Sequence, residues 1–132
     1  MRLRLIAVLV LLLCSVATTG LAEGTKVSMP LAVPSGPKAR YTRLEFEQVI
    51  DRVILATTMR EGPSGVSYAT RVIDCGQMRF KYLAEGDTLA ETRARRQTNR
   101  AQISSGGLGP LIRGSISDYV ARQACAAAIS PS

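Results

Sequence analysis

Four arginines form the most concentrated chemical feature of the chain: Arg93, Arg95, Arg96 and Arg100. Guanidinium groups stay positively charged and bind anionic oxygens through forked hydrogen bonds. The cluster is therefore a candidate patch for an anionic ligand, such as a sulfated glycan, an anionic lipid surface or an acidic protein face. The alternative is a solvated loop that aids solubility. No aromatic residue is interleaved for base stacking, so no nucleic-acid partner is expected.

The absence of histidine limits the chemistry open to this chain. Ser-His-Asp and Cys-His catalytic arrangements are excluded. The usual zinc sites need histidine or several thiolates, and we expect neither a metal nor a cofactor. Acid–base catalysis would fall to carboxylates, and none of the candidates lies in a recognisable motif. The candidates are Glu45, Glu47, Glu85, Asp87, Glu91 and Asp118. We therefore expect a protein that is not an enzyme.

The first residues show the order of a secretory signal peptide. Arg2 and Arg4 give a positive start, and the apolar run Leu5–Cys14 follows. This run is shorter than the roughly 20 residues that a membrane-spanning helix needs. Gly20 and Ala22 fit the small-x-small rule for cleavage. We therefore expect export, with cleavage after Ala22.

Two alternatives to cleavage remain open. The apolar segment could stay as an uncleaved membrane anchor, or a lipid could be attached at Cys14. Lipid attachment needs a small residue just before the cysteine, and Leu13 is not small. Cleavage would place the protein in the periplasm or at the cell surface, with no transmembrane segment left in it.

We divide the chain into the signal peptide at 1–22, an extended Pro/Gly-rich lead at 23–39 and a single compact domain at 40–132. Loss of the signal peptide leaves 15 basic side chains against 10 acidic ones. Such a positive balance favours anionic partners. We expect the partner to be an unknown protein or a polyanionic ligand.

The cysteines are consistent with an oxidising compartment. Cys75 and Cys125 are the two that remain when Cys14 leaves with the signal peptide. An even count in an exported chain favours a disulfide between them. Such a bridge would close a loop of about 50 residues and stabilise the domain by about 4 kcal/mol. The alternative is two free thiols or an intermolecular bond.

Alternating side chains predict a hairpin of two strands, at 66–74 and at 78–82.

Residues 41–60 are ambiguous. Their apolar spacing fits an amphipathic helix, whereas their β-branched residues favour two strands near 41–47 and 52–60. We favour the two strands.

Residues 86–114 lose periodicity and predict a mobile loop that carries the arginine cluster and could include part of a strand. A helix follows, with Ser115 as its cap and Asp118 three residues later. This helix is expected to end near Cys125, so the bridge would join it to the hairpin. The predicted fold class is α+β: a small antiparallel sheet with a C-terminal α-helix stapled to it by one disulfide.

This order of elements resembles the surface-adhesin E family of small exported Gram-negative envelope proteins. The residues that carry the resemblance are Val72-Ile73-Asp74-Cys75, then Arg79 with Phe80 and Tyr82, and Gly114-Ser115-Ile116-Ser117 through Ala124-Cys125. It covers roughly residues 40–125. Members commonly carry a tryptophan before the final helix. This chain has none, and Gly106 to Pro110 stand in its place.

The resemblance implies an antiparallel sheet with a C-terminal helix bridged to it. For the founding members it also implies binding of host matrix or serum proteins. We therefore expect a non-enzymatic binding module of the cell envelope or surface, adhesin-like and binding host or anionic ligands. The alternative is a periplasmic accessory or inhibitor protein of an envelope machine or enzyme. A small hydrolase that uses two carboxylates is a third interpretation.

Overall fold

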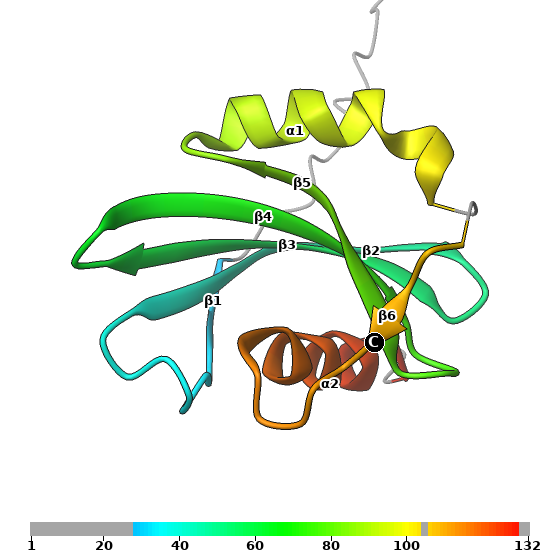
Figure 1. The fold of residues 1–132 in the computed structure, drawn as a ribbon, viewed down its shortest axis with the longest axis horizontal. Helices are drawn as coiled ribbons and strands as arrows, with labels where there is room; N and C mark the ends of the chain where they lie inside the picture. Colours follow the sequence, from blue (N-terminus) through cyan, green and yellow to red (C-terminus); the bar gives the residue numbers. More distant parts are fainter. Residues whose placement is uncertain (1–27, 104–105, 130–132) are drawn as a thin grey trace, which may run out of the picture.

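The computed structural model describes residues 28–103 and 106–129. Six strands form one antiparallel sheet in which each strand pairs with the next along the chain (Figure 1). The strands are β1 (Met29–Leu31), β2 (Arg40–Ile50), β3 (Val53–Gly62), β4 (Gly65–Asp74), β5 (Arg79–Gly86) and β6 (Gly109–Pro110). The helices are α1 (Leu89–Thr98), the short 3-10 turn η1 (Arg100–Gln102) and α2 (Ile116–Ile129).

Residues 41–60 form strands, and the helical alternative is wrong. Phe46 of β2 pairs with Ala56 of β3, in a ladder that extends to both ends of the hairpin. The register shifts between Arg43 and Glu45, and again near the turn. Each shift interrupts the two-residue alternation of apolar side chains that marks a strand. This interruption explains why the apolar spacing also fitted a helix.

The predicted hairpin of β4 and β5 is confirmed. Ile73 pairs with Phe80 across it. Asp74 Oδ1 accepts hydrogen bonds from the backbone N–H groups of Gly76 and Gln77, at 2.8 and 3.1 Å. A short aspartate side chain that bonds the backbone ahead of it stabilises a turn. The turn presents Cys75 at the end of the sheet.

The sheet carries one helix on each face (Figure 1). Successive residues of a strand point to opposite faces, so β3 gives Ile54 to one side and Leu55 to the other. Ile54 packs in a buried cluster with Val120 of α2. Leu55 packs on the opposite side with Leu83, and Ile103 packs against them just after η1. Burial on both faces accounts for the nearly continuous apolar run in β3.

Helix α2 begins and is bridged as the sequence predicts, but it ends later. Ser115 Oγ accepts a hydrogen bond from the Asp118 backbone N–H at 3.1 Å, as an N-cap does. A disulfide joins Cys75 to Cys125, with their Cα atoms 5.6 Å apart. The helix continues past Cys125 to Ile129 because alanine, the best helix former, occupies the next three positions. The predicted fold class is confirmed.

The prediction of a mobile loop over residues 86–114 is wrong, because this stretch contains α1 and η1, whereas the part of a strand that it allowed is present as β6. Helix α1 begins at a cap that apolar periodicity does not reveal. Thr88 Oγ1 accepts from the Glu91 backbone N–H at 3.1 Å, and Glu91 Oε2 accepts from the Asp87 N–H at 3.2 Å. These reciprocal bonds resemble a capping box. Thr92 is the one buried residue of this polar helix.

The expected lead at 23–39 contributes β1 to the sheet, where Leu31 pairs with Tyr41. The expected signal peptide and residues 23–27 lie outside the described part of the chain. Within the described residues, neither helix has the length and apolar character needed to cross a bilayer.

Candidate functional site

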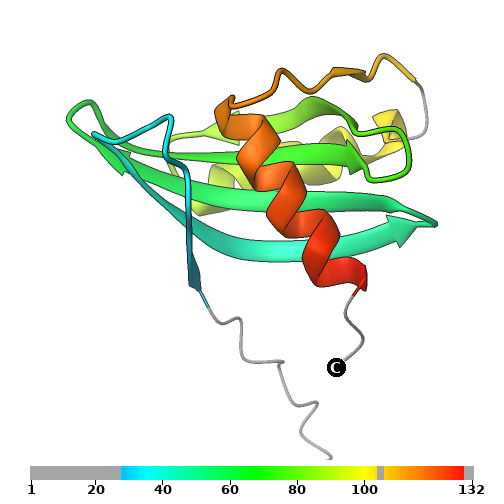
Figure 2. The ribbon, with the colours of Figure 1, turned by 90° about the horizontal axis from the view of Figure 1, so that it is seen from below.

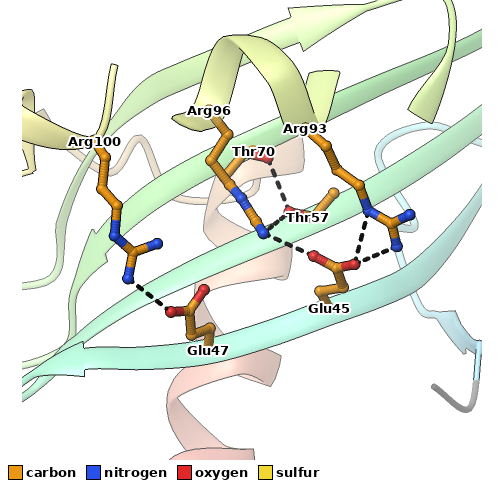
Figure 3. A network of polar contacts seen from close by, with 7 residues as sticks. All are labelled: Glu45, Glu47, Thr57, Thr70, Arg93, Arg96 and Arg100. Atoms are coloured by element: carbon orange, nitrogen blue, oxygen red, sulfur yellow. Dashed lines mark hydrogen bonds and ion pairs between the residues drawn. The ribbon is translucent and has the colours of Figure 1, made fainter. Parts of the chain in front are cut away.

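The arginine row comprises Arg93, Arg95, Arg96 and Arg100, and it lies along α1 and the start of η1. Figure 3 shows three of these side chains reaching toward β2. Arg93 donates to Glu45 Oε1 through Nε and Nη2, at 3.0 and 2.5 Å. Arg96 Nη1 donates to Glu45 Oε2 at 2.7 Å. One carboxylate, whose side chain is 10% exposed, therefore holds two guanidinium groups.

The other two arginines of the row also have partners. Arg100 Nη2 donates to Glu47 Oε1 at 3.0 Å. Arg95 Nη2 donates to Glu91 Oε1 at 2.5 Å, and its Nη1 donates to the carbonyl oxygen of Glu85 at 2.9 Å. Glu45 and Glu47 are two residues apart in β2 and share one face of that strand. The row is thus part of an ordered helix–sheet contact and does not lie on a solvated loop.

Hydroxyl groups continue this polar contact into the sheet. Thr57 and Thr70 face each other on neighbouring strands, with their Oγ1 atoms 2.8 Å apart, and both are buried. Arg96 Nη1 lies 3.4 Å from the Thr57 hydroxyl (Figure 3). Because buried polar groups need partners, these bonds fix where α1 sits on the sheet.

The row keeps an excess of positive charge after these pairings. Its four cations share three carboxylates, since Glu45 serves both Arg93 and Arg96. The side chains of Arg93, Arg95 and Arg100 are 40%, 57% and 43% exposed. Exposed guanidinium edges held in place by such pairs can still contact an anionic surface.

A second group of polar side chains lines a cavity that lies mainly on the opposite face of the sheet. The cavity has a volume of about 510 Å³. Its lining includes Tyr41, Thr58, Arg60, Arg71, Tyr82 and Ile116, together with Glu91 and Arg95 of α1. Ile116 is the first residue of α2, and Figure 2 shows that this helix leaves one end of the sheet face uncovered. The cavity lies beside the N-terminus of α2.

Arg71 is the central charged residue of this cavity, and only 4% of its surface is exposed. Its Nε donates to Ser117 Oγ at 3.1 Å, its Nη1 to Thr58 Oγ1 at 2.9 Å and its Nη2 to Tyr82 Oη at 3.4 Å. The guanidinium also lies 4.9 Å from the centre of the Tyr82 ring. Among the described residues, no carboxylate forms an ion pair with it.

Sequence reasoning missed Arg71. In the alternating pattern of β4 it shares a face with Ser67 and Ala69, and that face reads as the solvent side. The face is covered instead by α2, which buries the arginine. A lone arginine among small residues in a strand is the only signal that could have drawn attention to it.

Asp118, in the first turn of α2, is buried and fully engaged. Its Oδ2 accepts from the Gly114 backbone N–H at 2.8 Å, and its Oδ1 accepts from Arg122 Nε at 3.0 Å. The Gly114 hydrogen bond, followed by the Arg122 side chain, holds the pKa of Asp118 below its ordinary value of 3.8, although burial acts in the opposite direction. Its negative charge is therefore already paired with donors at the N-terminal end of α2.

The remaining candidate carboxylates are not gathered into one catalytic centre. Glu85, Asp87 and Glu91 line the cavity, whereas Glu45 and Glu47 lie under α1. Within residues 28–103 and 106–129, no cluster of carboxylates and thiols could hold a metal ion.

The chain matches no model of a known protein family, and no curated protein and no solved structure matches it.

Proposed function

We propose that this chain is a non-enzymatic binding module of the bacterial cell envelope or surface that contacts an anionic ligand through the arginine row. The observation that carries the proposal is the sharing of Glu45 by Arg93 and Arg96. The antiparallel sheet with its bridged C-terminal helix agrees with what the resemblance to the surface-adhesin E family implies. That resemblance supports an exported, adhesin-like role.

The geometry of the row favours a polyanion over a small ligand. Its arginines are spread along one helix, and their guanidinium groups are oriented in advance by carboxylates of β2 and α1. Preorganised side chains lose less conformational entropy when they bind. The excess of basic over acidic side chains that remains after loss of the signal peptide, 15 against 10, adds a long-range attraction for anionic surfaces. An acidic protein face or a sulfated glycan supplies repeated negative groups of the matching kind.

Heparin chromatography of the full chain tests the proposal, with heparin as a model polyanion. The test variant is Arg95→Gln with Arg100→Gln, because both side chains are exposed and their ion pairs are worth little to stability. The control is Arg40→Gln with Arg113→Gln, two exposed residues outside the row that remove the same charge.

We expect the test variant to elute at a distinctly lower salt concentration than the control variant. Equal shifts in the two variants would mean that net charge alone retains the protein, and the row would lose its assigned role. Failure of the unmodified chain to bind heparin at low ionic strength would count against a polyanionic ligand.

A further inference from the structure

We infer that the cavity beside the N-terminus of α2 binds a single oxyanion group, carboxylate, sulfate or phosphate, at Arg71. This cavity lies mainly on the opposite face of the sheet from Glu45 and Glu47, and Arg95 is the one member of the arginine row that lines it. The inference therefore goes beyond the proposed function and does not depend on it.

The first argument is the burial of an unneutralised charge. Arg71 is 4% exposed, and its described neighbours offer hydroxyl groups in place of a carboxylate. Burying a cation without a counter-charge is costly. Asp118 follows Ser117 in the chain and is buried, but its carboxylate already accepts hydrogen bonds from Gly114 and Arg122. A bound anion would supply the missing charge.

The second argument counts hydrogen-bond donors. A guanidinium has five N–H groups, and the structure uses one on each of the three nitrogens of Arg71. Each terminal nitrogen therefore keeps one N–H group. These two remaining N–H groups can donate to two oxygens of one carboxylate, sulfate or phosphate, as arginine commonly does.

The third argument is that the surroundings hold these two N–H groups in place. Tyr82 stacks near the guanidinium, and its hydroxyl oxygen lies 3.3 Å from Ser117 Oγ. Ser117 belongs to the first turn of α2, whose positive end favours an anion. The hydroxyls of Tyr82, Ser117 and Thr58 can also rotate to donate to a ligand oxygen. A cavity of about 510 Å³ is large enough for a sugar or amino-acid unit that carries the anion.

Acidic residues at the edge of the cavity set a limit on affinity. Glu91 is paired with Arg95, whereas Glu85 and Asp87 are exposed. Glu85 lies opposite Ala69 in the ladder, on the same face as Arg71. Its charge should repel an incoming anion. Removing that charge should therefore strengthen anion binding, whereas replacing Arg71 should weaken it.

Nuclear magnetic resonance of the full chain tests the inference directly. The Nε–H resonance of Arg71, assigned by its absence in Arg71→Lys, is followed while sodium acetate, sulfate or phosphate is added at constant ionic strength. We expect a saturable shift of this resonance, with no matching shift at Arg93, Arg96 and Arg100, the row arginines that do not line the cavity. We expect Arg71→Lys to weaken binding at least about tenfold and Glu85→Gln to strengthen it severalfold. Shifts of backbone resonances around the cavity report binding in the lysine variant.

The anion that saturates at the lowest concentration identifies the chemistry of the natural ligand. Acetate indicates a carboxylate ligand, sulfate a sulfated one and phosphate a phosphorylated one. A linear, unsaturated response to all three anions overturns the inference. An equal response of Arg93, Arg96 and Arg100, or no gain from Glu85→Gln, also overturns it. The Glu85→Gln result is read from backbone resonances around the cavity and does not require Arg71→Lys to fold. Arg100→Gln, which changes a row arginine that does not line the cavity, should titrate like the unmodified chain, so this inference and the proposed function can fail separately.

Discussion

Glu45 of β2 and Arg96 of α1 form an ion pair of 2.7 Å in which the two side chains are only 10% and 18% exposed. Exposed ion pairs are screened by water and contribute little, whereas this pair is shielded from solvent by the helix above it. Thr92 is the one residue of α1 that is buried. The charged contact is therefore the main link between α1 and β2.

Replacement of Glu45 by glutamine should destabilise the domain by about 1–3 kcal/mol, because two guanidinium groups lose their shared carboxylate. Urea unfolding followed by circular dichroism measures this change. Glu47→Gln is the matched control, since that exposed pair with Arg100 should be worth less than about 0.5 kcal/mol. Equal losses in the two variants would show that Glu45 has no special role in holding α1.

Much of the sheet could be predicted from the sequence, but α1 could not be predicted from its apolar residues. The β4–β5 hairpin has the alternation that a strand requires. Helix α1 instead docks through charges, so its sequence lacks an apolar stripe. The signal that could have revealed it is local: Thr88 and Glu91 form the cap, and Glu91 pairs with Arg95 one turn later.

The Arg71 cavity was missed for a different reason. Strand alternation separates two faces, but it does not tell which of them is covered. Prediction of α2 from Ser115 onward placed a helix against the sheet, yet nothing in one sequence fixes how far it extends over each strand. Burial of Arg71 depends on that placement, and so does the cavity beyond Ile116.

Asp118 should make stability depend on pH in the acidic range. Its pKa is lowered in the folded state, so the ionised carboxylate stabilises the fold above about pH 4, and this contribution is lost as pH falls through the folded pKa. At neutral pH, Asp118→Asn should cost about 1–2 kcal/mol. The difference from the unmodified chain should shrink toward zero as pH falls through the folded pKa of Asp118, which lies below 3.8.

Thermal unfolding between pH 2 and pH 7 measures this difference. Asp51→Asn, in the exposed turn between β2 and β3, is the control and should change stability by less than about 0.5 kcal/mol at every pH. A constant gap between Asp118→Asn and the unmodified chain would contradict a role for the ionised carboxylate.

Export can be tested by the intact mass of the protein recovered from the envelope fraction of a Gram-negative host. We expect a chain that begins at Glu23, because the positive start, the short apolar run and the small residues before Glu23 fit a cleaved signal peptide. A mass that includes Met1, or a lipid at Cys14, would disprove this processing.

The disulfide between Cys75 and Cys125 should contribute a large part of the stability of the domain. It joins residues 50 positions apart and ties the C-terminal half of α2 to the β4–β5 turn. The apolar contacts of Val120 and Ala124 with the sheet remain without it. The double change Cys75→Ser, Cys125→Ser should still cost about 2–5 kcal/mol, because the unfolded chain regains the freedom that the closed loop removes.

Such a loss corresponds to a fall in melting temperature of roughly 10–30 °C for a domain of this size. Calorimetry measures it, with reductant as the matched control. Reduction should lower the melting temperature of the unmodified protein to that of the double variant and leave the variant unchanged, because only the bridge is affected. Thiol titration of the unfolded, non-reduced exported protein completes the test. Two free thiols per chain, or a melting temperature that reductant does not move, would contradict a bridge that stabilises the fold.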